Sequence, residues 1–523
     1  MKYPIGIQTF EDIRRGNFVY VDKTALIHRL ATEGKIYFIS RPRRFGKSLL
    51  LSTLKAYFEG KRALFAGLAI AGLETEWTRY PVFHIDFNAK DFSKPGELEA
   101  YIEGFLSASE RRYGKDEVFT TMGDRFISVL SRAKEQTGRQ AVVLIDEYDK
   151  PLLDVLDTPQ EQVNRNILKA FYSTFKAADE HLRFVMLTGV TKFSQVSVFS
   201  GFNQPNDISM DDDYDTLCGI TTEELHQTFA EPIRALAEKR GWTVERTKEE
   251  LRQQYDGYHF SARMKGVYNP FSILNALSKK RMDDFWFKTA TPTYLIRLMT
   301  HFNENLNEML CRNYTAEEFE DYRADVERPL PMLYQSGYIT IKGYDMEYNE
   351  YRLDFPNREV SRGFLTLLTS HYLNPRELSG PWASEVSKSL KRGNLDKLRT
   401  QLTAFMAGIP YSLRRKQGAE EQERDFQYTF YLIMRLIGDY VVLAEHQQSQ
   451  GRVDCVVLTP EYIYIFEFKR DGTARQALDQ IHTAGYAREY RADPRPVYLI
   501  GCNFSTQTGT IDDWAVEEVG QIF

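Results

Sequence analysis

The sequence predicts an α/β protein in which a parallel sheet with crossover helices is followed by a helical region and a second, smaller α/β domain. Short continuous apolar runs, separated by longer helical stretches, lie at 36–39, 82–87, 141–147 and 183–190. This pattern is typical of parallel strands that helices bury on both faces. Near the end of the chain, two further strand-like runs at 452–458 and 462–469 flank a short turn.

Length and composition limit the class of protein. The chain has 523 residues, 42% of them hydrophobic, and can therefore build the cores of roughly two to four domains. Its net charge of −6 gives no global signature of nucleic-acid or membrane binding, so such a partner would need a local basic patch. Four scattered cysteines without a CxxC pair fit a reducing compartment and argue against zinc or a disulfide framework. Without a signal peptide or an apolar run of about 18 residues, we expect a cytoplasmic protein.

The first apolar run leads into Gly46-Lys47-Ser48 and then into a helical pattern, the order of a strand, a phosphate loop and a helix. Gly46 lets backbone N–H groups close around phosphate oxygens, Lys47 supplies charge to the β- and γ-phosphates, and Ser48 offers a hydroxyl to Mg²⁺. The common motif has glycine five residues before Gly46, where this chain has Arg41. The alternative is an accidental Gly-Lys-Ser in a basic loop, and the flanking strand and helix patterns argue against it.

Polar residues end the third and fourth apolar runs. Asp146 and Glu147 would lie at the carboxyl edge of the sheet, where open α/β folds bind their ligands. We expect Asp146 to hold Mg²⁺ through water and Glu147 to orient and deprotonate the attacking water. Thr188 could sense the γ-phosphate or be an ordinary threonine at the edge of the core. An exposed acidic strand end is the alternative for the two carboxylates.

The stretch Arg41–Leu54, with Tyr20–Thr24 before it and Tyr57–Gly60 after it, resembles the bacterial AAA-ATPase-like proteins that carry a C-terminal PD-(D/E)xK nuclease-like domain. The resemblance implies a P-loop NTPase core in which arginine is usual at position 41. It also implies that Arg43 or Arg44 touches phosphate, although basic residues on an exposed loop are the simpler interpretation. The segment 20–24 could lie over the nucleotide base. The expected ATP-binding residues are Arg43, Arg44, Phe45, Gly46, Lys47, Ser48, Leu49, Asp146 and Thr188, with Ser48 and Asp146 as Mg²⁺ ligands.

From about residue 205 the pattern becomes helical. Thr221-Thr-Glu-Glu224 is a capping signal for an amphipathic helix through Leu236. The motif Tyr255–Phe260 also resembles the family and is expected in a helical lid behind the nucleotide. Between 325 and 360, a helix followed by a two-stranded ribbon is compatible with a winged-helix-like module or with plain structure. Residues 376–419 carry nine Lys/Arg and three acids, a net of +6, and fit either a solvated helical linker or a nucleic-acid contact.

The last predicted domain, 420–523, has a net charge of −8, from nine Lys/Arg and seventeen Asp/Glu. Period-two alternation places Glu467 and Lys469 on one face of the second strand of the hairpin, and Asp454 lies in the first. Two carboxylates can hold Mg²⁺ or Mn²⁺ while the lysine stands beside the water or the transition-state charge.

The resemblance to the PD-(D/E)xK fold adds Glu423 as an extra metal-supporting glutamate, and Gln480 lies on the helix after the lysine strand. Residues 496–501 read as a further core strand. No proline precedes Asp454, a departure that the superfamily tolerates. An inactive relic that still binds metal is the alternative.

We therefore expect an ATPase core at 1–205, a helical lid with the winged-helix-like module at 206–375, a basic helical linker at 376–419 and a nuclease-like domain at 420–523. The expected function is ATP binding and hydrolysis, with Glu147 as the catalytic base, coupled to metal-dependent cleavage of DNA by Asp454, Glu467 and Lys469. The alternative is an ATP-dependent switch whose nuclease-like domain is inactive and binds a partner or nucleic acid. We expect no membrane partner, and the oligomeric state stays open.

Overall fold

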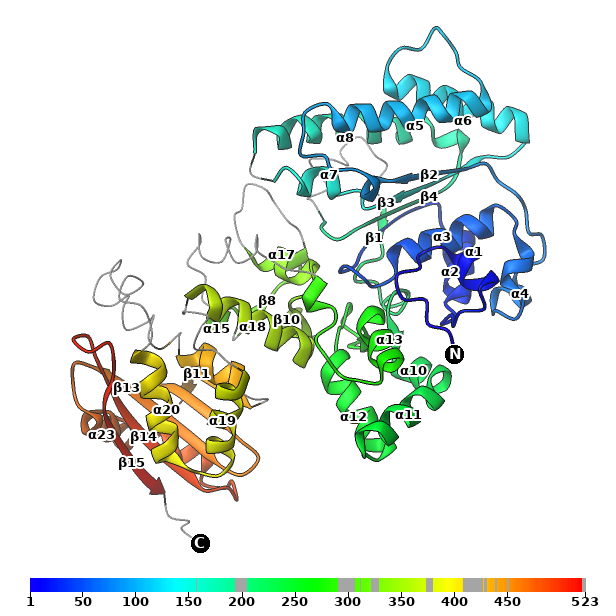
Figure 1. The fold of residues 1–523 in the computed structure, drawn as a ribbon. Helices are drawn as coiled ribbons and strands as arrows, with labels where there is room; N and C mark the ends of the chain where they lie inside the picture. The colour runs from blue at the N-terminus through cyan, green and yellow to red at the C-terminus, as the bar shows by residue number, and fades with distance from the viewer. Residues whose placement is uncertain are drawn as a thin grey trace. The chain divides into compact units, whose positions relative to one another are not determined.

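The computed structural model divides the chain into two compact units (Figure 1). The first comprises 1–302 and 312–360, and the second comprises 303–311 and 361–523. The described residues are 1–156, 158–192, 205–289, 306–310, 312–320, 329–372, 380–407, 427, 430–437, 440–448 and 451–519. Within these ranges, no helix combines the length and the apolar character that crossing a membrane requires.

A five-stranded sheet forms the centre of the first unit. Its strands are β1 (Ile36–Ser40), β2 (Val82–Asp86), β3 (Ala141–Asp146), β4 (Leu182–Gly189) and β5 (Asn206–Asp207). All neighbours are parallel and the order is β2-β3-β4-β1-β5, so the parallel sheet that the four apolar runs predict is confirmed, while β5 was not predicted. This order puts β4 between β1 and β3, and the carboxyl ends of these three strands therefore lie side by side.

Helices cover both faces of this sheet, which is why β3 is buried along its whole length. One face carries α5 (Glu97–Tyr113), α6 (Met122–Thr137) and α8 (Pro159–Ala177), and the other carries α1 (Phe10–Arg15), α2 (Thr24–Glu33) and α3 (Lys47–Phe58) (Figure 1). Short helices α4 (Ile70–Leu73) and α7 (Lys150–Leu153) complete this layer structure. The apolar side of α3, with Leu50, Leu51 and Leu54, is buried.

The helical region of the first unit has its own core. It consists of α10 (Thr222–Thr228), α11 (Ala230–Arg240), α12 (Val244–Tyr255) and α13 (Pro270–Lys279), with the short strands β6 (Ile220–Thr221) and β7 (Val267–Tyr268). The predicted capping box of Thr221 and Glu224 is confirmed, but the single helix predicted through Leu236 is wrong, because the chain forms two helices that meet at Phe229. Tyr3, Val19 and Val21 pack against this core.

A three-stranded ribbon follows in the first unit. It joins β8 (Asn313–Tyr314), β10 (Glu350–Asp354) and β9 (Thr340–Asp345) in this order. The helices α16 (Ala316–Glu320) and α17 (Pro329–Gln335) lie between β8 and β9 in the chain. The predicted order of a helix and then a two-stranded ribbon is present as α17, β9 and β10. The winged-helix interpretation stays a prediction.

The second unit contains a mixed five-stranded sheet. Its strands are β11 (Val441–Gln448), β12 (Gly451–Leu458), β13 (Ile463–Arg470), β14 (Val497–Ser505) and β15 (Thr510–Val519), in sequence order. β13 and β14 are parallel and the other pairs antiparallel, so the predicted hairpin and further strand are confirmed, and the two edge strands were not predicted.

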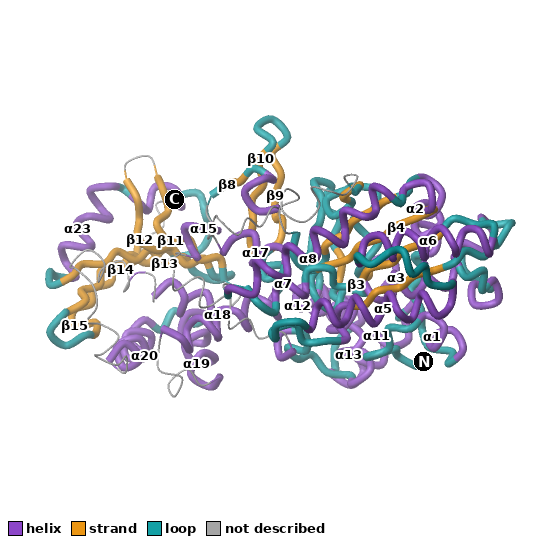
Figure 2. The backbone as a smooth tube through the Cα atoms, turned by 90° about the horizontal axis from the view of Figure 1, so that it is seen from above, coloured by secondary structure: helices purple, strands orange, loops and turns teal. Residues whose placement is uncertain are grey.

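Helices α19 (Gly380–Lys391) and α20 (Leu395–Ala407) cover one face of this sheet, and α23 (Ala474–Ala484) covers the other (Figure 2). The remaining helices are α15 (Leu306–Leu310) and α18 (Arg358–Tyr372). Tyr464 donates a hydrogen bond to Leu390 O, and Thr510 to Thr403 O, so the described part of the predicted linker packs on the sheet.

Candidate nucleotide and metal sites

The loop 41–46 joins β1 to α3 and holds two residues with left-handed backbone. Gly46 has φ +99° and Arg44 has φ +71°, whereas Arg41 has no positive φ. Gly46 ends the loop directly before α3, which begins at Lys47. Position 41 is glycine in the common motif. The backbone conformation of this chain does not require glycine there, because only a positive φ favours glycine over other residues.

Lys47 lies under this loop with its ammonium turned inward. Its side chain is 3% exposed, and Nζ donates to Arg41 O at 2.9 Å and to Pro42 O at 3.4 Å. The same ammonium lies 3.4 Å from Oε1 of Glu147, whose side chain is 20% exposed. Ser48 follows on the first turn of α3 and is half-buried. The structure therefore brings the predicted lysine and the predicted catalytic base together.

The carboxyl ends of β3 and β4 are joined by side-chain bonds. Thr188 Oγ1 donates to Asp146 Oδ1 at 2.6 Å, and both residues are buried. Glu147 follows β3 with φ +51°, an uncommon conformation for a residue other than glycine. The next residue, Tyr148, donates its backbone N–H to Thr188 O at 3.0 Å. The polar residues predicted at these two strand ends therefore share one edge of the sheet.

Asp149 belongs to the same edge, and the sequence reasoning missed it. It is fully buried, and its Oδ2 accepts from the backbone N–H of Val190 at 3.0 Å and of Thr191 at 2.6 Å. Burial, followed by the negative charge of Glu147, raises the pKa of Asp149 to about 7. A signal was available, because a second aspartate three residues after Asp146 can reach back to the neighbouring strand end.

The other predicted loop residues contact protein groups. The side chains of Arg43 and Arg44 are exposed, Arg43 O accepts from Trp286 Nε1 at 2.9 Å, and the Arg44 guanidinium lies 5.0 Å from the ring of Phe271. Phe45 is buried, with its ring 4.8 Å from that of Tyr258 and 5.5 Å from that of Phe260. The lid motif predicted behind the nucleotide thus packs on the phosphate loop itself.

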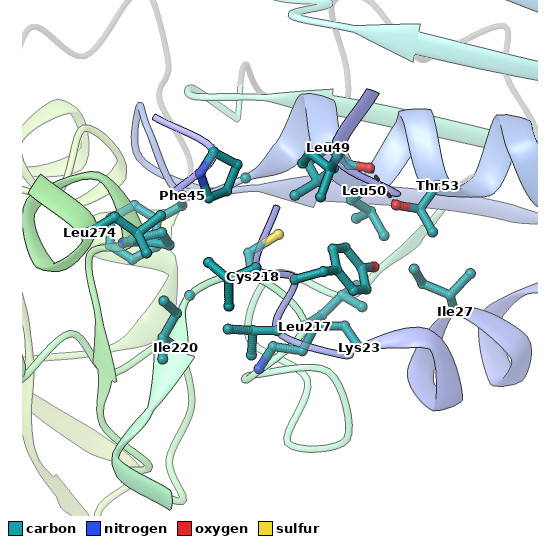
Figure 3. Close-up of a pocket in the computed structure, with 18 of the residues that line it drawn as sticks. Lys23, Ile27, Phe45, Leu49, Leu50, Thr53, Leu217, Cys218, Ile220 and Leu274 are labelled. Carbon is teal, nitrogen blue, oxygen red and sulfur yellow. Dashed lines mark hydrogen bonds between the residues drawn. The ribbon is translucent and has the colours of Figure 1, made fainter. Parts of the chain in front are cut away.

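A cavity of about 100 Å³ opens beside the loop (Figure 3). Figure 3 shows Ile27, Leu50, Leu217, Ile220 and Leu274 around it, and Gly46 and Leu49 also line it. Tyr20, Val21 and Lys23 of the segment 20–24 contribute to its wall. The Lys23 ammonium is held by Glu224 at 2.6 and 2.7 Å, so the wall is mainly apolar with one paired charge.

A second group of predicted residues meets on the hairpin of the other unit. Asp454 Oδ2 accepts from the backbone N–H of Phe468 at 2.7 Å, and Glu467 Oε1 lies 3.5 Å from Lys469 Nζ. The Glu467 side chain is 2% exposed, and its Oε2 has no hydrogen-bond partner among the described residues. Burial, followed by the nearby charge of Asp454, raises the pKa of Glu467 to about 8.

Two glutamines complete this group. Lys469 Nζ donates to Gln480 Oε1 of α23 at 2.5 Å, and Gln427 Nε2 donates to Asp454 Oδ1 at 3.2 Å. Gln427 was missed, although it follows the predicted Glu423 by four residues, one helical turn. Glu423 itself lies outside the described residues. In the described ranges, no three His, Cys, Asp or Glu side chains lie close enough together to hold a metal ion. The described carboxylates that could bind a metal at this site are therefore those of Asp454 and Glu467.

Comparison with family models agrees with this division of the chain. Residues 4–199 match the model described as "Predicted AAA-ATPase", which spans the parallel sheet up to the end of β4. Residues 421–514 match the model of the PD-(D/E)XK nuclease superfamily, which spans the hairpin with Asp454, Glu467 and Lys469. The predicted α/β fold class, with a P-loop NTPase sheet and a C-terminal PD-(D/E)xK-like domain, is confirmed.

The proteins found similar to this chain include the following two. A protein of Azotobacter chroococcum mcd 1, named "Uncharacterized protein in vnfD 5'region", is 36% identical over 529 residues, which cover 99% of each chain. The solved structure of the Aeropyrum pernix Orc1 protein in complex with DNA matches 67% of this chain and 93% of its own, at 12% identity and a TM-score of 0.25. A TM-score this low supports no conclusion about fold or ligand.

Proposed function

Because the chain belongs to the family of AAA-ATPase-like proteins that carry a C-terminal PD-(D/E)XK nuclease superfamily domain, we propose that it binds and hydrolyses ATP and cleaves DNA in a metal-dependent reaction. The observation that supports the ATPase half best is the buried ammonium of Lys47. It lies under a loop at a helix N-terminus and faces the strand-end carboxylate Glu147. A buried cation beside free backbone N–H groups is an arrangement that favours a phosphate anion.

In this proposal, each residue at the edge of the sheet has a separate role. Lys47 exchanges its carbonyl partners for the β- and γ-phosphate oxygens, which releases Glu147 to accept a proton from the attacking water. The hydroxyl of Ser48 and the carboxylate of Asp146 are oxygen donors of the kind that Mg²⁺ prefers. When bound, Mg²⁺ neutralises charge on the phosphates. Thr188 keeps the Asp146 carboxylate oriented through its 2.6 Å hydrogen bond.

The apolar cavity supplies a place for the base. It borders Gly46 and is walled by the segment 20–24, so a nucleotide whose phosphates lie in the loop could put a flat purine ring there. Leu217 and Ile220 from one side and Leu50 from the other would enclose the ring (Figure 3). Burial of the base in this cavity would add affinity beyond that of the phosphates.

The DNA-cleaving half rests on the hairpin of the second unit. The Oε2 of Glu467, which has no hydrogen-bond partner among the described residues, and the raised pKa of this carboxyl fit a binding place for a cation, and Asp454 supplies a second carboxylate beside it. Mg²⁺ or Mn²⁺ bound there would supply Lewis-acid chemistry at a phosphodiester. Lys469, positioned by Gln480, would stabilise the negative charge that develops on the phosphate.

The basic segment 376–419, for which a solvated helical linker and a nucleic-acid contact were both left open, lies away from the carboxylates where it is described. The described cations of 376–419 are exposed and lie on α19, on α20 or in the turn between them: Lys388, Lys391, Arg392, Lys397 and Arg399. These helices cover the face of the sheet from which Tyr464 donates its hydrogen bond to Leu390 O. Lys469 contacts α23, which covers the other face (Figure 2). We therefore expect any nucleic acid that contacts these five cations to lie away from the carboxylates.

The test uses the purified full-length chain. Calorimetry with Mg²⁺ and ATP measures binding, phosphate release measures hydrolysis, and plasmid and single-stranded DNA with Mg²⁺ or Mn²⁺ measure cleavage, each with an EDTA control. Absence of ATP binding would refute the ATPase proposal. ATP hydrolysis without cleavage of either DNA would favour the alternative, a switch with an inactive nuclease-like domain.

A further inference from the structure

Arg41 is a buried arginine at the position where the common phosphate-loop motif has glycine. It is 1% exposed, and its Nη1 donates to Ser209 O at 2.7 Å and to Ser40 O at 2.9 Å. Nη2 lies 3.4 Å from Tyr214 O, and the guanidinium carbon is 4.1 Å from the centre of the Phe260 ring. The side chain therefore packs against the segment after β5 and the lid, and it is not among the residues that line the cavity.

This guanidinium has no carboxylate partner in the described part of the chain, since no ion pair within 4.0 Å is formed there. Its charge is met by three backbone carbonyls and one aromatic face. Burial lowers the pKa of Arg41, but arginine keeps its proton in proteins. A shorter side chain would leave the carbonyls of Ser209 and Tyr214 without this donor, and it would leave a void beside Phe260.

The backbone of Arg41 holds the two parts of the proposed site together. Its carbonyl accepts from Lys47 Nζ at 2.9 Å, and its N–H donates to Gly189 O at 3.1 Å, directly after Thr188. A side chain that fixes the peptide of Arg41 therefore also fixes the oxygen against which Lys47 rests. The same side chain fixes the distance between the loop and the end of β4.

We propose that Arg41 is a positioning residue for Lys47, which ties the phosphate loop to the segment 209–214 and to Phe260 without touching the nucleotide. The proposal rests on the proposed function, since it concerns the affinity of the same site for ATP. In this proposal, the anchored guanidinium is the fixed point of a loop that lacks the first glycine of the common motif. Conversion of Arg41 to the common glycine should then weaken ATP binding.

The experiment measures ATP affinity by calorimetry, and melting temperature without nucleotide, for the full-length chain. We expect Arg41→Ala to raise the dissociation constant for ATP at least tenfold. Arg41→Lys should recover part of the loss, because an ammonium can still donate to one carbonyl. Arg62→Ala removes an exposed arginine from the same unit and serves as the matched control, with unchanged affinity.

Two outcomes would overturn the proposal. One is an Arg41→Ala protein with a lower melting temperature but an ATP affinity within twofold of wild type, because the residue would then be structural only. If Arg41→Ala does not fold, the second is unchanged ATP affinity in Phe260→Leu, which removes the aromatic face over the guanidinium. A wild-type chain that binds no ATP would instead refute the proposed function, so the two failures are distinguishable.

Discussion

Each unit contains a lysine and a glutamate at nearly the same distance, but burial is reversed between the two pairs. In the first unit the Lys47 side chain is 3% exposed and Glu147 is 20% exposed, at 3.4 Å. In the second, Glu467 is 2% exposed and Lys469 is 29% exposed, at 3.5 Å. Because a buried charge without sufficient compensation favours a ligand of opposite sign, the first pair suits an anion such as phosphate and the second suits a metal cation.

The largest expected effect tests the buried cation. Lys47→Ala should abolish ATP binding, because it removes the charge that faces the β- and γ-phosphates. Glu147→Gln should keep ATP affinity within a fewfold of wild type and lose at least a hundredfold in turnover, since only the proton acceptor is gone. Calorimetry and phosphate release distinguish the two. Equal ATP affinity for wild type and Lys47→Ala would contradict the first half of the comparison.

The second prediction tests the buried anion. Asp454→Ala should lose both Mn²⁺ binding and DNA cleavage, because it removes one of the two described carboxylates. Lys469→Ala should keep Mn²⁺ binding and lose cleavage, because its charge serves the developing phosphate charge and not the metal.

Calorimetry with Mn²⁺ and a plasmid-nicking assay give the two readouts for this pair. Cleavage by wild type should require divalent metal and fall with added salt, as expected when cations contact a phosphate backbone. Nicking that persists in EDTA, or in Asp454→Ala, would show that the hairpin is not its source.

The third prediction concerns the proposed ATP site of the first unit. It distinguishes the contribution of the base to ATP affinity from that of the phosphates. Leu274→Trp places a larger side chain at the cavity wall and should weaken ATP binding roughly tenfold. The affinity for inorganic tripolyphosphate, which has no base, should stay unchanged. Leu73→Trp, at a leucine that is 52% exposed, is the matched control. Equal losses for ATP and tripolyphosphate would mean that the substitution distorts the loop and that the base lies elsewhere.

The sequence predicted the strands whose pattern is local. Continuous apolar runs identified β1 to β4, and alternation identified the hairpin with Glu467 and Lys469 on one face, because both signals come from neighbouring residues. The strands β5, β11 and β15 were not predicted. β5 has only two residues and acidic residues interrupt β15, so neither contains a continuous apolar run. β11 begins with the apolar residues Val441–Ala444, but it continues into a polar half.

The same limit applies to the sites. Lys47, Asp146 and Glu147 could be predicted from neighbouring residues. Lys47 lies in a Gly-Lys-Ser tripeptide between a strand pattern and a helix pattern, and the two acids directly end an apolar run. Three contacts of the site join residues that are far apart in sequence. They are the ion pair of Lys47 with Glu147, the hydrogen bonds that Asp149 accepts from Val190 and Thr191, and the hydrogen bond of Arg41 with Ser209. Only the spacing of Asp149 from Asp146 offers a sequence signal for one of these contacts. The others depend on how the strand ends and the lid meet in space.

The smallest expected effect tests whether burial, the main cause of the raised pKa of Glu467, also raises the pKa of a carboxyl group with neutral hydrogen-bond partners. Glu359 in the first unit is 1% exposed, accepts from Ser272 Oγ at 2.7 Å and Trp286 N at 2.6 Å, and has its pKa raised by burial to about 7. Between its ordinary value of 4.5 and about 7, the folded state holds a proton that the unfolded state releases. Stability must therefore fall as pH rises through this window, by on the order of 1–3 kcal/mol.

Glu359→Gln mimics the protonated carboxyl, so its unfolding free energy should match wild type near pH 5 and exceed it near pH 8. Urea unfolding of the nucleotide-free protein at both pH values measures the difference. Glu245→Gln, at an exposed glutamate of α12, should leave the pH dependence of wild type unchanged. An identical pH dependence in wild type and Glu359→Gln would mean that polar partners compensate a buried carboxylate here without a cation. The argument that the burial of Glu467 favours a metal cation would then lose its physical basis.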